Sequence, residues 1–297
     1  MAQLVARLHG MEEVWGSNPH SSTSWGPKSR VYLGRVSDFG MHRDISPDTF
    51  QSHASSFGQE AALYAESRPD YPDAAVLWAL EPVAGRSPLR VLDLGAGTGK
   101  LTEALLRHAG EVVAVEPDPA MLGELRRWLP EVRALGGSAE EIPLPDGSVD
   151  AILVGQAMHW FDLDRAAPEM ARVLTPGGVL AGLWNTHDDR VPWVAELSRV
   201  SDRSIRTFRD WSPEGFDLAM PRFPAIEHAA FPHAHRRTAE SLVATIATHS
   251  QVLLLPEADR SALDGRITSY LRSLPETAEG EFDVPLVTAV IRGVVAS

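Results

Sequence analysis

Residues 89–100, with the sequence LRVLDLGAGTGK, indicate the fold class of this 297-residue chain. A short apolar run over residues 89–94 leads directly into glycines at alternate positions, and a helix-forming stretch begins near Lys100. Glycines directly after a buried strand allow a tight backbone turn and the close approach of a ligand, and the helix that follows offers free N–H groups to a negative group. The stretch therefore predicts a strand, a ligand-binding turn and a helix.

Four more apolar runs follow this unit, and helix-forming stretches separate most of them. The runs cover residues 111–117 (EVVAVEP), 131–137 (EVRALGG), 150–156 (DAILVGQ) and 178–185 (GVLAGLWN). Strands that alternate with helices at this spacing are typical of a mostly parallel sheet with helices on both faces. The sequence therefore predicts a doubly wound α/β fold.

The alternation loosens after Asn185. We expect a helix around residues 193–206, a strand over 225–235, two helices over 238–248 and 256–273, and a final β-branched run over 282–295. We interpret the final run as a strand that closes the sheet edge. The prediction is one doubly wound domain with a helical insertion before its last strand.

Composition and charge exclude several classes of function. The chain has no cysteine, which rules out disulfides, thiolate nucleophiles and cysteine-ligated metal sites and suits a reducing compartment. A net charge of -13 disfavours nucleic acid and anionic membranes and favours a small, neutral or cationic ligand. No apolar run approaches the roughly 18 residues that span a bilayer, and the first residues lack the apolar core of a secretory signal, so we expect a cytoplasmic protein.

The glycine turn does not have the spacing of two common nucleotide-binding motifs. A dinucleotide fingerprint needs a third glycine at position 100, which is Lys100. A Walker A loop needs glycine at position 94, which is Leu94, and serine or threonine at position 101, which is Leu101. What remains is an acid, Asp93, two places before the first of three alternating glycines.

This pattern over residues 93–99 resembles the first motif of the class I S-adenosylmethionine-dependent methyltransferases. The downstream spacing is also similar, because Glu116 ends the second strand and Leu174-Thr175-Pro176-Gly177-Gly178 precedes the fifth. A carboxylate at the end of the second strand can accept two hydrogen bonds from vicinal ribose hydroxyls. The resemblance implies a Rossmann-like fold with the strand order 3-2-1-4-5-7-6.

The resemblance also implies which residues hold S-adenosyl-L-methionine and its product S-adenosyl-L-homocysteine. The glycine turn lies under the methionyl part, the acid of the first motif lies near the amino group, the loop over 137–143 borders the adenine, and the end of the fourth strand faces the methyl donor. The implied cofactor-binding residues are Asp93, Gly95, Ala96, Gly97, Glu116, Pro117, Met121, Ser138, Ala139, Glu140 and Gln156. Met121 can pack against the adenine or be an ordinary core methionine, and many relatives have aspartate in place of Ser138.

Methyl transfer from a sulfonium is a direct displacement, so the protein must align the reacting atoms in a dry pocket. A carboxylate acceptor needs no base, whereas a hydroxyl or an amine needs a proton acceptor. His159 lies just past the fourth strand and is the candidate base, the alternative being a packing histidine. Trp160 can form a pocket wall or belong to the core.

The His159-Trp160 pair and the stretch FGQEAALYAESRPDYP over residues 57–72 resemble the methyltransferase type 11 branch that includes trans-aconitate methyltransferase-like proteins. This implies an amino-terminal helix over the cofactor, with Tyr64 and Arg68 as contacts to its carboxylate. Arg68 can equally be a surface charge at a helix end. The implied function is methyl transfer to a small-molecule acceptor at oxygen, nitrogen or carboxylate.

These features suggest a division of the chain. The first forty residues have no helical or strand periodicity, and we expect residues 1–50 to be a disordered tail or an over-extended gene start. Residues 51–297 form the methyltransferase domain: cap helices over 51–85, the cofactor-binding core over 88–186, and a substrate-side, sheet-completing region over 187–297.

Three other features have open interpretations. His233 and His235 share one strand face, but no partner is spaced to complete a metal site, so no metal is expected. The run His187-Asp188-Asp189 lies on the ligand side and is typical of a solvated loop or a helix cap. Four apolar residues of the region after residue 206 can form a lid over the acceptor or belong to the core: Trp211, Phe216, Met220 and Phe223.

Two rival functions remain open. One is a methyltransferase of the same fold that acts on RNA or protein, which the acidic balance disfavours. The other is a protein that binds S-adenosylmethionine without transferring its methyl group, because a fold alone does not determine function. The expected partner is a small-molecule acceptor, with neither nucleic acid nor membrane.

Overall fold

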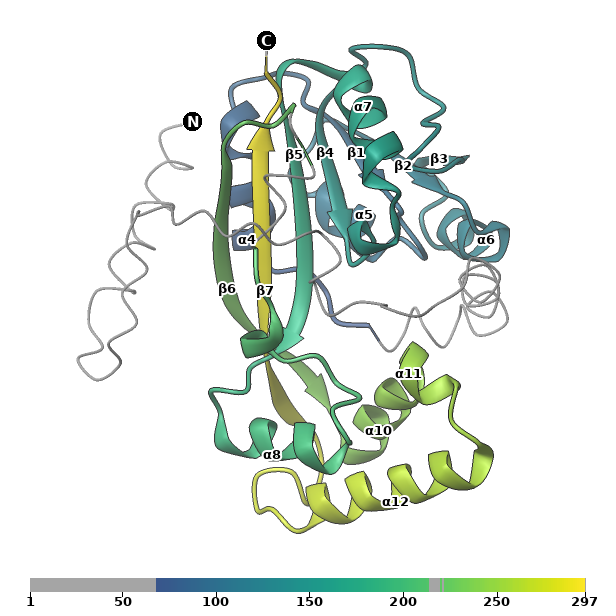
Figure 1. The fold of residues 1–297 in the computed structure, drawn as a ribbon, viewed down its shortest axis with the longest axis vertical. Coiled ribbons are helices and arrows are strands. Elements are labelled where there is room, and N and C mark those ends of the chain that lie inside the picture. The colour runs from purple at the N-terminus through teal and green to yellow at the C-terminus, as the bar shows by residue number, and fades with distance from the viewer. Residues whose placement is uncertain (1–67, 214–219, 221, 297) are drawn as a thin grey trace, which may run out of the picture. The chain divides into compact units, whose positions relative to one another are not determined.

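The computed structural model describes residues 68–213, 220 and 222–296, and all of these belong to one compact unit (Figure 1). The expected tail over residues 1–50 and the first of the two cap helices, with Tyr64, lie outside the described residues. The second cap helix is present as α4, after the turn that contains Pro69 and Pro72.

A seven-stranded sheet forms the centre of the fold. Its order is β3-β2-β1-β4-β5-β7-β6, and only β7 runs antiparallel to its neighbours, so the strand order that the resemblance implies is confirmed. The strands are β1 (Arg90–Leu94), β2 (Glu111–Glu116), β3 (Arg133–Gly136), β4 (Val149–Gly155), β5 (Leu174–His187), β6 (Ile226–Arg237) and β7 (Phe282–Val294).

The helices cover both faces of the sheet and one of its ends (Figure 1). The α-helices are α4 (Asp73–Leu80), α5 (Lys100–Leu106), α6 (Pro119–Trp128), α7 (Leu163–Val173), α8 (Pro192–Val200), α10 (Ala239–Ala247), α11 (Ser250–Leu253) and α12 (Glu257–Arg272). Short 3-10 turns are η3 (Glu81–Val83), η4 (Met158–Trp160) and η5 (Phe208–Asp210).

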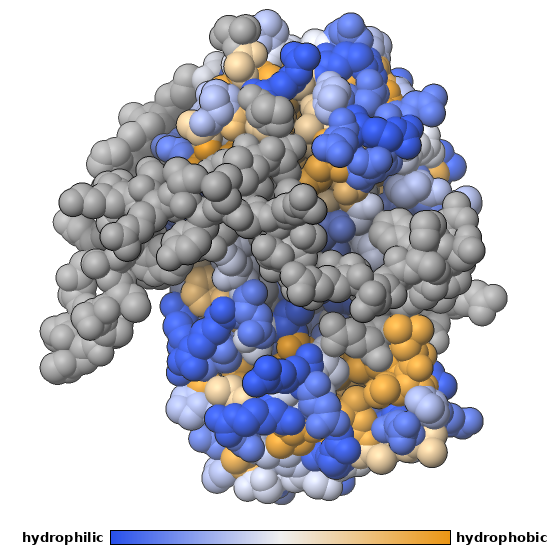
Figure 2. All heavy atoms as spheres, in the orientation of Figure 1, coloured by the Kyte–Doolittle hydropathy of each residue, from blue (hydrophilic) through white to orange (hydrophobic). Residues whose placement is uncertain are grey.

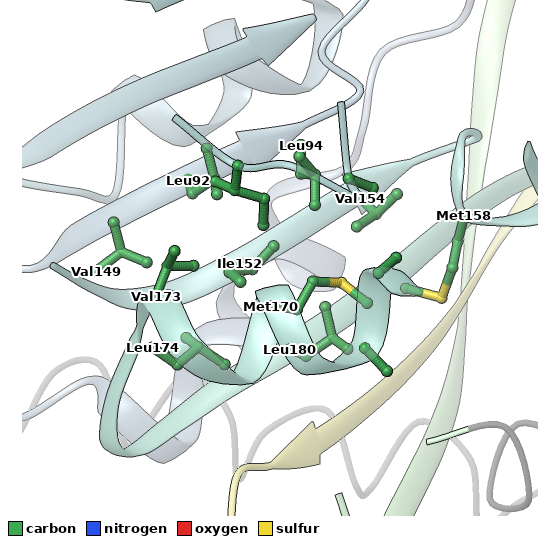
Figure 3. Close-up of a cluster of buried hydrophobic side chains, with 14 of the residues drawn as sticks. Leu92, Leu94, Val149, Ile152, Val154, Met158, Met170, Val173, Leu174 and Leu180 are labelled. Carbon is green, nitrogen blue, oxygen red and sulfur yellow. The ribbon is translucent and has the colours of Figure 1, made fainter. Parts of the chain in front are cut away.

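Alternation along the strands assigns side chains to the two faces. In β1, Leu92 packs with Met170 of α7, whereas Val91 packs with Leu105 of α5 and with α4 on the other face. Figure 3 shows the first of these clusters, in which side chains from β1, β4 and β5 meet those of α7. Because both faces are covered, the central strands read as continuous apolar runs.

The final strand does not close the sheet edge, so that expectation is wrong. β7 lies between β5 and β6, and its central residues from Leu286 to Ile291 are buried. An apolar, β-branched run is most stable where both of its faces are covered and both of its edges are paired. The edge belongs to β6, which is more exposed and contains Pro232, a residue without an N–H group to donate.

The helix expected over residues 193–206 ends earlier, at Val200. Asp202 and Arg203 adopt left-handed backbone conformations, with φ of 52° and 58°, and these cannot continue an α-helix. The segment that follows is therefore a loop, and it returns toward the end of β5, where the backbone N–H of His187 donates to the carbonyl of Arg206 at 2.9 Å.

The helical insertion has a hydrophobic cluster of its own. Leu197 of α8, Ile246 of α10 and Ile267 of α12 pack with the first residues of β7, including Val284. These helices lie beyond the end of the sheet at which β5 and β6 end (Figure 1). Figure 2 shows a mixed surface with an apolar area beside α11, where Leu254 is exposed.

The opposite end of the sheet is held by one buried carboxylate. Asp150 of β4 accepts hydrogen bonds from the Arg90 backbone and guanidinium at 3.0 to 3.1 Å, from Arg86 at 2.9 Å and from the Thr175 hydroxyl at 3.1 Å. Burial by itself would raise the pKa of Asp150, but the hydrogen bonds from Arg90, Arg86 and Thr175 outweigh it and lower the pKa. Asp150 therefore joins β1, β4 and β5.

We expect Asp150→Asn to lower the free energy of unfolding by about 2 to 3 kcal/mol at pH 7, because the arginines lose a charged acceptor. Since the folded-state pKa of Asp150 lies below its unfolded value, this stabilisation is present above about pH 4 and is lost as the pH falls further. Urea unfolding of both proteins between pH 3 and pH 7 measures the difference.

Asp146→Asn is the matched control, because Asp146 also pairs with an arginine, Arg172, but its side chain is 82% exposed. Its expected effect is within about 0.5 kcal/mol. Equal effects of the two substitutions would show that Asp150 is no more than a surface partner.

Candidate active site

The turn after β1 is fixed by its neighbours on both sides. Gly95 and Gly97 have φ of +71° and +57°, which glycine adopts without strain. The backbone N–H groups of Gly95 and Ala96 donate to the carbonyl of Val115 in β2 at 2.9 and 3.1 Å. A Cβ added to Gly95 would lie 2.7 Å from the Cβ of Ala157, so the turn has room for glycine alone at this contact.

Glu116 at the end of β2 holds this turn. One carboxylate oxygen accepts the N–H of Gly97 at 2.8 Å, and the other accepts the N–H of Asp118 at 2.9 Å. Burial raises the pKa of Glu116, and the two backbone N–H groups act in the opposite direction. A carboxylate has about four lone-pair positions, so each oxygen can accept one more hydrogen bond from a ligand.

Asp93 lies beneath the turn and is fully buried. The Thr102 hydroxyl of α5 donates to its Oδ2 at 2.6 Å, while its Oδ1 has no hydrogen-bond partner among the residues that the structure describes. Burial raises the pKa of Asp93 to about 7, and the nearby Glu116 charge acts in the same direction. The site thus has an acid that changes charge near neutral pH.

Met121 and Pro117 lie next to the turn. Asp118 caps α6 by accepting the N–H groups of Ala120 and Met121 at 2.8 and 2.9 Å. Met121 is buried, and its sulfur would be 3.9 Å from a Cβ built on Gly97. It therefore borders the turn from the side of α6, and Pro117 directly follows Glu116.

The loop after β3 places the three predicted cofactor contacts in different surroundings. Ser138 forms an isolated bridge with Glu141, and Ala139 is buried in the hydrophobic core. Glu140 accepts the backbone N–H of Asp162 at 2.9 Å and so connects this loop to the start of α7.

A cavity of about 150 Å³ lies at the carboxyl ends of the strands. Ligands of open α/β sheets bind at such strand ends. Three residues that follow β4 line it, namely Gln156, His159 and Trp160, and Arg68 lines it too. None of the residues of the glycine turn is among the lining residues. Ala157 links the two regions, since it contacts the turn and lies between Gln156 and His159.

Hydrogen bonds among the strand ends make part of the cavity wall rigid. The Gln156 amide donates to the carbonyl of Asn185 at 2.9 Å, and Gln156 itself has a left-handed φ of 58°. The Asn185 amide donates to the carbonyls of Pro69 and Asp70 at 3.3 Å, and its oxygen accepts the Thr288 hydroxyl at 2.6 Å. A strained non-glycine residue in a fixed wall is typical of functional sites.

Five more titratable residues line the cavity, and the sequence did not predict that they lie together. They come from β5, the loop after α8, β6 and the segment after α10, and they are His187, Arg206, His235, Arg237 and His249. Arg206 was not predicted as a site residue because the sequence predicts it inside a helix. Arg237 was not predicted because the predicted strand ends at His235. The alternation that places His233 and His235 on one face also includes Arg237.

Burial favours the neutral form of two of these histidines, His187 and His249. Nδ1 of His187 lies 3.3 Å from the carbonyl of Arg206, and Nδ1 of His249 lies 3.0 Å from the carbonyl of Ser204. Because a carbonyl can only accept, each Nδ1 carries the proton and donates. Burial lowers the pKa of His187 to about 4 and that of His249 to about 3.

The run after β5 and the possible lid have specific places in the structure. Asp188 and Asp189 are buried rather than solvated: Asp188 pairs with Arg190 at 2.7 Å, and Asp189 accepts the N–H of Arg209 at 3.3 Å. Two members of the possible lid, Met220 and Phe223, are core residues with 1% exposure, and Trp211 packs beside that core. Phe216 lies outside the described residues.

Neither a metal-binding cluster nor a membrane-spanning helix occurs among the residues that the structure describes. Over residues 68–213, 220 and 222–296, no group of three or more histidine, aspartate or glutamate side chains is placed to hold a metal ion. Within the same ranges, no helix combines the length and the apolar character required to cross a membrane.

Comparisons with known proteins identify the family. The family model described as "Methyltransferase domain" matches residues 92–182. An uncharacterised methyltransferase of Mycobacterium tuberculosis is 42% identical over 243 residues, which are 81% of this chain and 96% of the relative. A methyltransferase-like protein of Schizosaccharomyces pombe is 33% identical over 228 residues, which are 76% of this chain and 89% of the relative.

A solved structure agrees with this result. A protein assigned as a type II methyltransferase from Anaeromyxobacter dehalogenans is 28% identical and superimposes with a TM-score of 0.58, covering 77% of this chain and 98% of that chain. The alignment with the Mycobacterium tuberculosis relative covers nearly the whole length of that protein. The strand order and the glycine turn are those that the resemblance implies. The chain therefore belongs to the class I S-adenosylmethionine-dependent methyltransferase family and is a methyltransferase.

Proposed function

We propose that this protein transfers a methyl group from S-adenosyl-L-methionine to a small-molecule acceptor by direct displacement. The bound cofactor supplies an electrophilic methyl group on a sulfonium. The observation that carries the proposal is the Glu116 carboxylate, which is held against the Gly97 N–H and keeps a free lone pair on each oxygen.

The residues around the turn fit the cofactor. Glu116 accepts the two ribose hydroxyls, a role that requires a carboxylate with two adjacent acceptor oxygens. Among the residues that the structure describes, only the sulfur of Met121 lies within 4 Å of a Cβ built on Gly97, which leaves space beside this sulfur. In the proposal this space receives the cofactor, with Gly95 and Ala96 beneath its methionyl part and Met121 and Pro117 beside its adenosine.

Asp93 supplies the negative charge that the α-ammonium group of the cofactor requires. Its unpartnered Oδ1 is buried beneath the turn, and an adjacent cation would stabilise the ionised form. Ser138, Ala139 and Glu140 border the adenine in the proposal. Ser138 is a shorter side chain than the aspartate of many relatives, so the backbone of this loop makes a larger share of the adenine contacts.

The cavity beside the turn is the proposed acceptor site. Its volume of about 150 Å³ is similar to that of an engineered protein cavity that binds benzene, which favours a small molecule over a protein or nucleic acid chain. Gln156 faces the methyl donor, and Trp160 forms a wall that excludes water. His159, whose ring centroid lies 4.9 Å from that of Trp160, accepts a proton when the acceptor is a hydroxyl or a protonated amine.

We expect S-adenosylhomocysteine to bind the purified protein in the micromolar range and Glu116→Ala to weaken binding by about 1.5 to 3 kcal/mol, because hydrogen bonds to a charged acceptor are lost. Glu116→Gln keeps the side-chain size and one oxygen acceptor, so its effect should be intermediate. Calorimetric titration, with NADH as the comparison ligand, measures these affinities.

Glu111→Ala is the matched control, because Glu111 is an exposed glutamate at the other end of the same strand. Its affinity should equal that of the unchanged protein. Thermal unfolding of every variant separates a lost contact from a lost fold. If the folded, unchanged protein binds NADH and not S-adenosylhomocysteine, the proposed function is wrong.

We also expect the binding of S-adenosylhomocysteine to release a proton. The pKa of Asp93 is about 7 without ligand, so the carboxyl is largely protonated at pH 6, and a bound ammonium favours its ionised form. The affinity should therefore rise by up to about tenfold between pH 6 and pH 8. Titrations in two buffers of different ionisation enthalpy count the released proton.

Asp93→Asn should bind without this proton release and with a nearly constant affinity between pH 6 and pH 8. The exposed Asp146→Asn variant should behave like the unchanged protein. Equal proton release from the Asp93→Asn variant would assign the titration to another group.

A further inference from the structure

A row of three polar side chains crosses the neighbouring strands β5, β7 and β6. Asn185 of β5 and Thr288 of β7 are directly opposed in the sheet. His233 of β6 is diagonal to Thr288, because the residue of β6 that faces Thr288 is Phe231. Hydrogen bonds join the row, with 2.6 Å between the Thr288 hydroxyl and Oδ1 of Asn185 and 3.0 Å between that hydroxyl and Nε2 of His233.

The row continues the face of the sheet that α4 covers. Three apolar side chains lie two positions from the members of the row, on the same face of the same strands, and are buried with residues of α4: Leu183, Phe231 and Val290. The chain just before α4 covers the polar row in turn, since the Asn185 amide donates to the carbonyls of Pro69 and Asp70 at 3.3 Å.

Residues 68–71, which we call the strap, have further contacts at the ends of other strands. Asp70 pairs with Lys100, the first residue of α5, at 3.1 Å, but the Asp70 side chain is exposed and such a pair contributes little. Tyr71 is buried, and a Cβ built on Gly155 at the end of β4 would lie 2.5 Å from the Tyr71 hydroxyl oxygen. The strap therefore joins the start of α5, next to the glycine turn, to the ends of β4 and β5.

The hydrogen bonds of the row determine the orientation of each group. Carbonyl oxygens only accept, so Asn185 directs Nδ2 to the strap and Oδ1 to Thr288. The Thr288 hydroxyl has one proton and gives it to Oδ1, so His233 donates from Nε2 to the hydroxyl oxygen. Burial lowers the pKa of His233 to about 4, and the imidazole is therefore neutral at pH 7 with its proton on Nε2.

We propose that Asn185 is a positioning residue that holds the strap in place as one wall of the proposed acceptor cavity. Two residues of the strap, Arg68 and Pro69, line this cavity, and Asn185 lines it too. The strap lies outside helices and strands, so side-chain contacts must hold it. Thr288 fixes the Asn185 amide, and the row thereby connects the strap to three paired strands. The inference rests on the proposed function for the role of the cavity.

The experiment measures backbone order in the strap by NMR on the full-length, isotope-labelled protein without ligand. The N–H groups of Asp70 and Tyr71 report on the strap, since proline has none. We expect their order parameters to be about 0.85 in the unchanged protein and below about 0.6 in Asn185→Ala and Asn185→Asp. The aspartate keeps an acceptor for Thr288 and lacks the N–H donors, so this variant removes the contacts to the strap alone.

Variants of Thr288 test the row itself. Thr288→Val removes the hydroxyl at similar size and releases the Asn185 amide, so the order parameters of the strap should fall. Thr288→Ser keeps the hydroxyl and should match the unchanged protein. Thr186→Val is the matched control, because Thr186 is also buried and donates to the carbonyl of Val287 at 3.1 Å, but lies on the opposite face from Asn185. Thermal unfolding verifies that each variant is folded.

Long-range proton–nitrogen spectra of the histidine rings give an independent signature of the row. We expect His233, identified by the loss of its signal in His233→Gln, to carry its proton on Nε2. His187 and His249, whose Nδ1 atoms donate to backbone carbonyls, should show the other tautomer and serve as internal references.

A thiol probe connects the strap to the cavity. The chain has no cysteine, and Ser204 lines the cavity with a hydroxyl that has no hydrogen-bond partner among the described residues, so Ser204→Cys adds a single thiol without removing such a bond. Iodoacetamide should modify this thiol at least about fivefold faster when Asn185→Ala is added, as the loss of ordinary hydrogen bonds predicts. Adding Thr186→Val should leave the rate unchanged.

The outcomes separate this inference from the proposed function. Unchanged order parameters in the Asn185 variants, an equal fall in Thr186→Val, or a His233 proton on Nδ1 alone overturns the inference. A mobile strap with an unchanged rate of thiol modification overturns its role as a wall of the cavity. None of these measurements uses S-adenosylhomocysteine, so its failure to bind would remove the proposed function and leave the result on the strap intact.

Discussion

The two hydrogen bonds that the Glu116 carboxylate accepts from backbone N–H groups are the constraint on which the rest of the site depends. Gly97 belongs to the turn after β1 and Asp118 to the start of α6, so one side chain fixes both segments at the end of β2. Burial opposes the ionised state that this role requires, and the two N–H groups compensate for part of that cost. The turn, the cap of α6 and the position of Met121 follow from this arrangement.

The candidate site has two parts, the glycine turn and the cavity at the strand ends, and Ala157 lies between them. The turn side has the buried acids Asp93 and Glu116, which suit the cationic and hydroxylated parts of the proposed cofactor. On the cavity side, Arg206 and Arg237 line the wall together with His187, whose pKa burial lowers to about 4. In the proposed reaction the turn holds the methyl donor and the cavity holds the acceptor at adjacent places, which assists their alignment.

Local patterns made the parallel half of the fold and the turn predictable. Strands β1 to β4 are apolar runs, each near a turn signal, and the glycines at 95, 97 and 99 with Glu116 at the next strand end define the turn. The second half was less predictable for identifiable reasons. Asp202 and Arg203, just after α8, adopt left-handed conformations that their residue types do not predict. The apolar run of β7 does not by itself indicate which strands it pairs with.

The sequence by itself determined the fold class, the glycine turn and the acids beneath and beside it, because these depend on residue type and on short spacings along the chain. The tertiary structure decided the place of β7 between β5 and β6 and the composition of the cavity. Arg206 and Arg237 are 31 positions apart in the sequence, by subtraction of their numbers. They line one cavity because the loop after α8 returns to the end of β5, and β6 ends at the same end of the sheet as β5. Such a meeting depends on strand pairing and loop path, which no local pattern specifies.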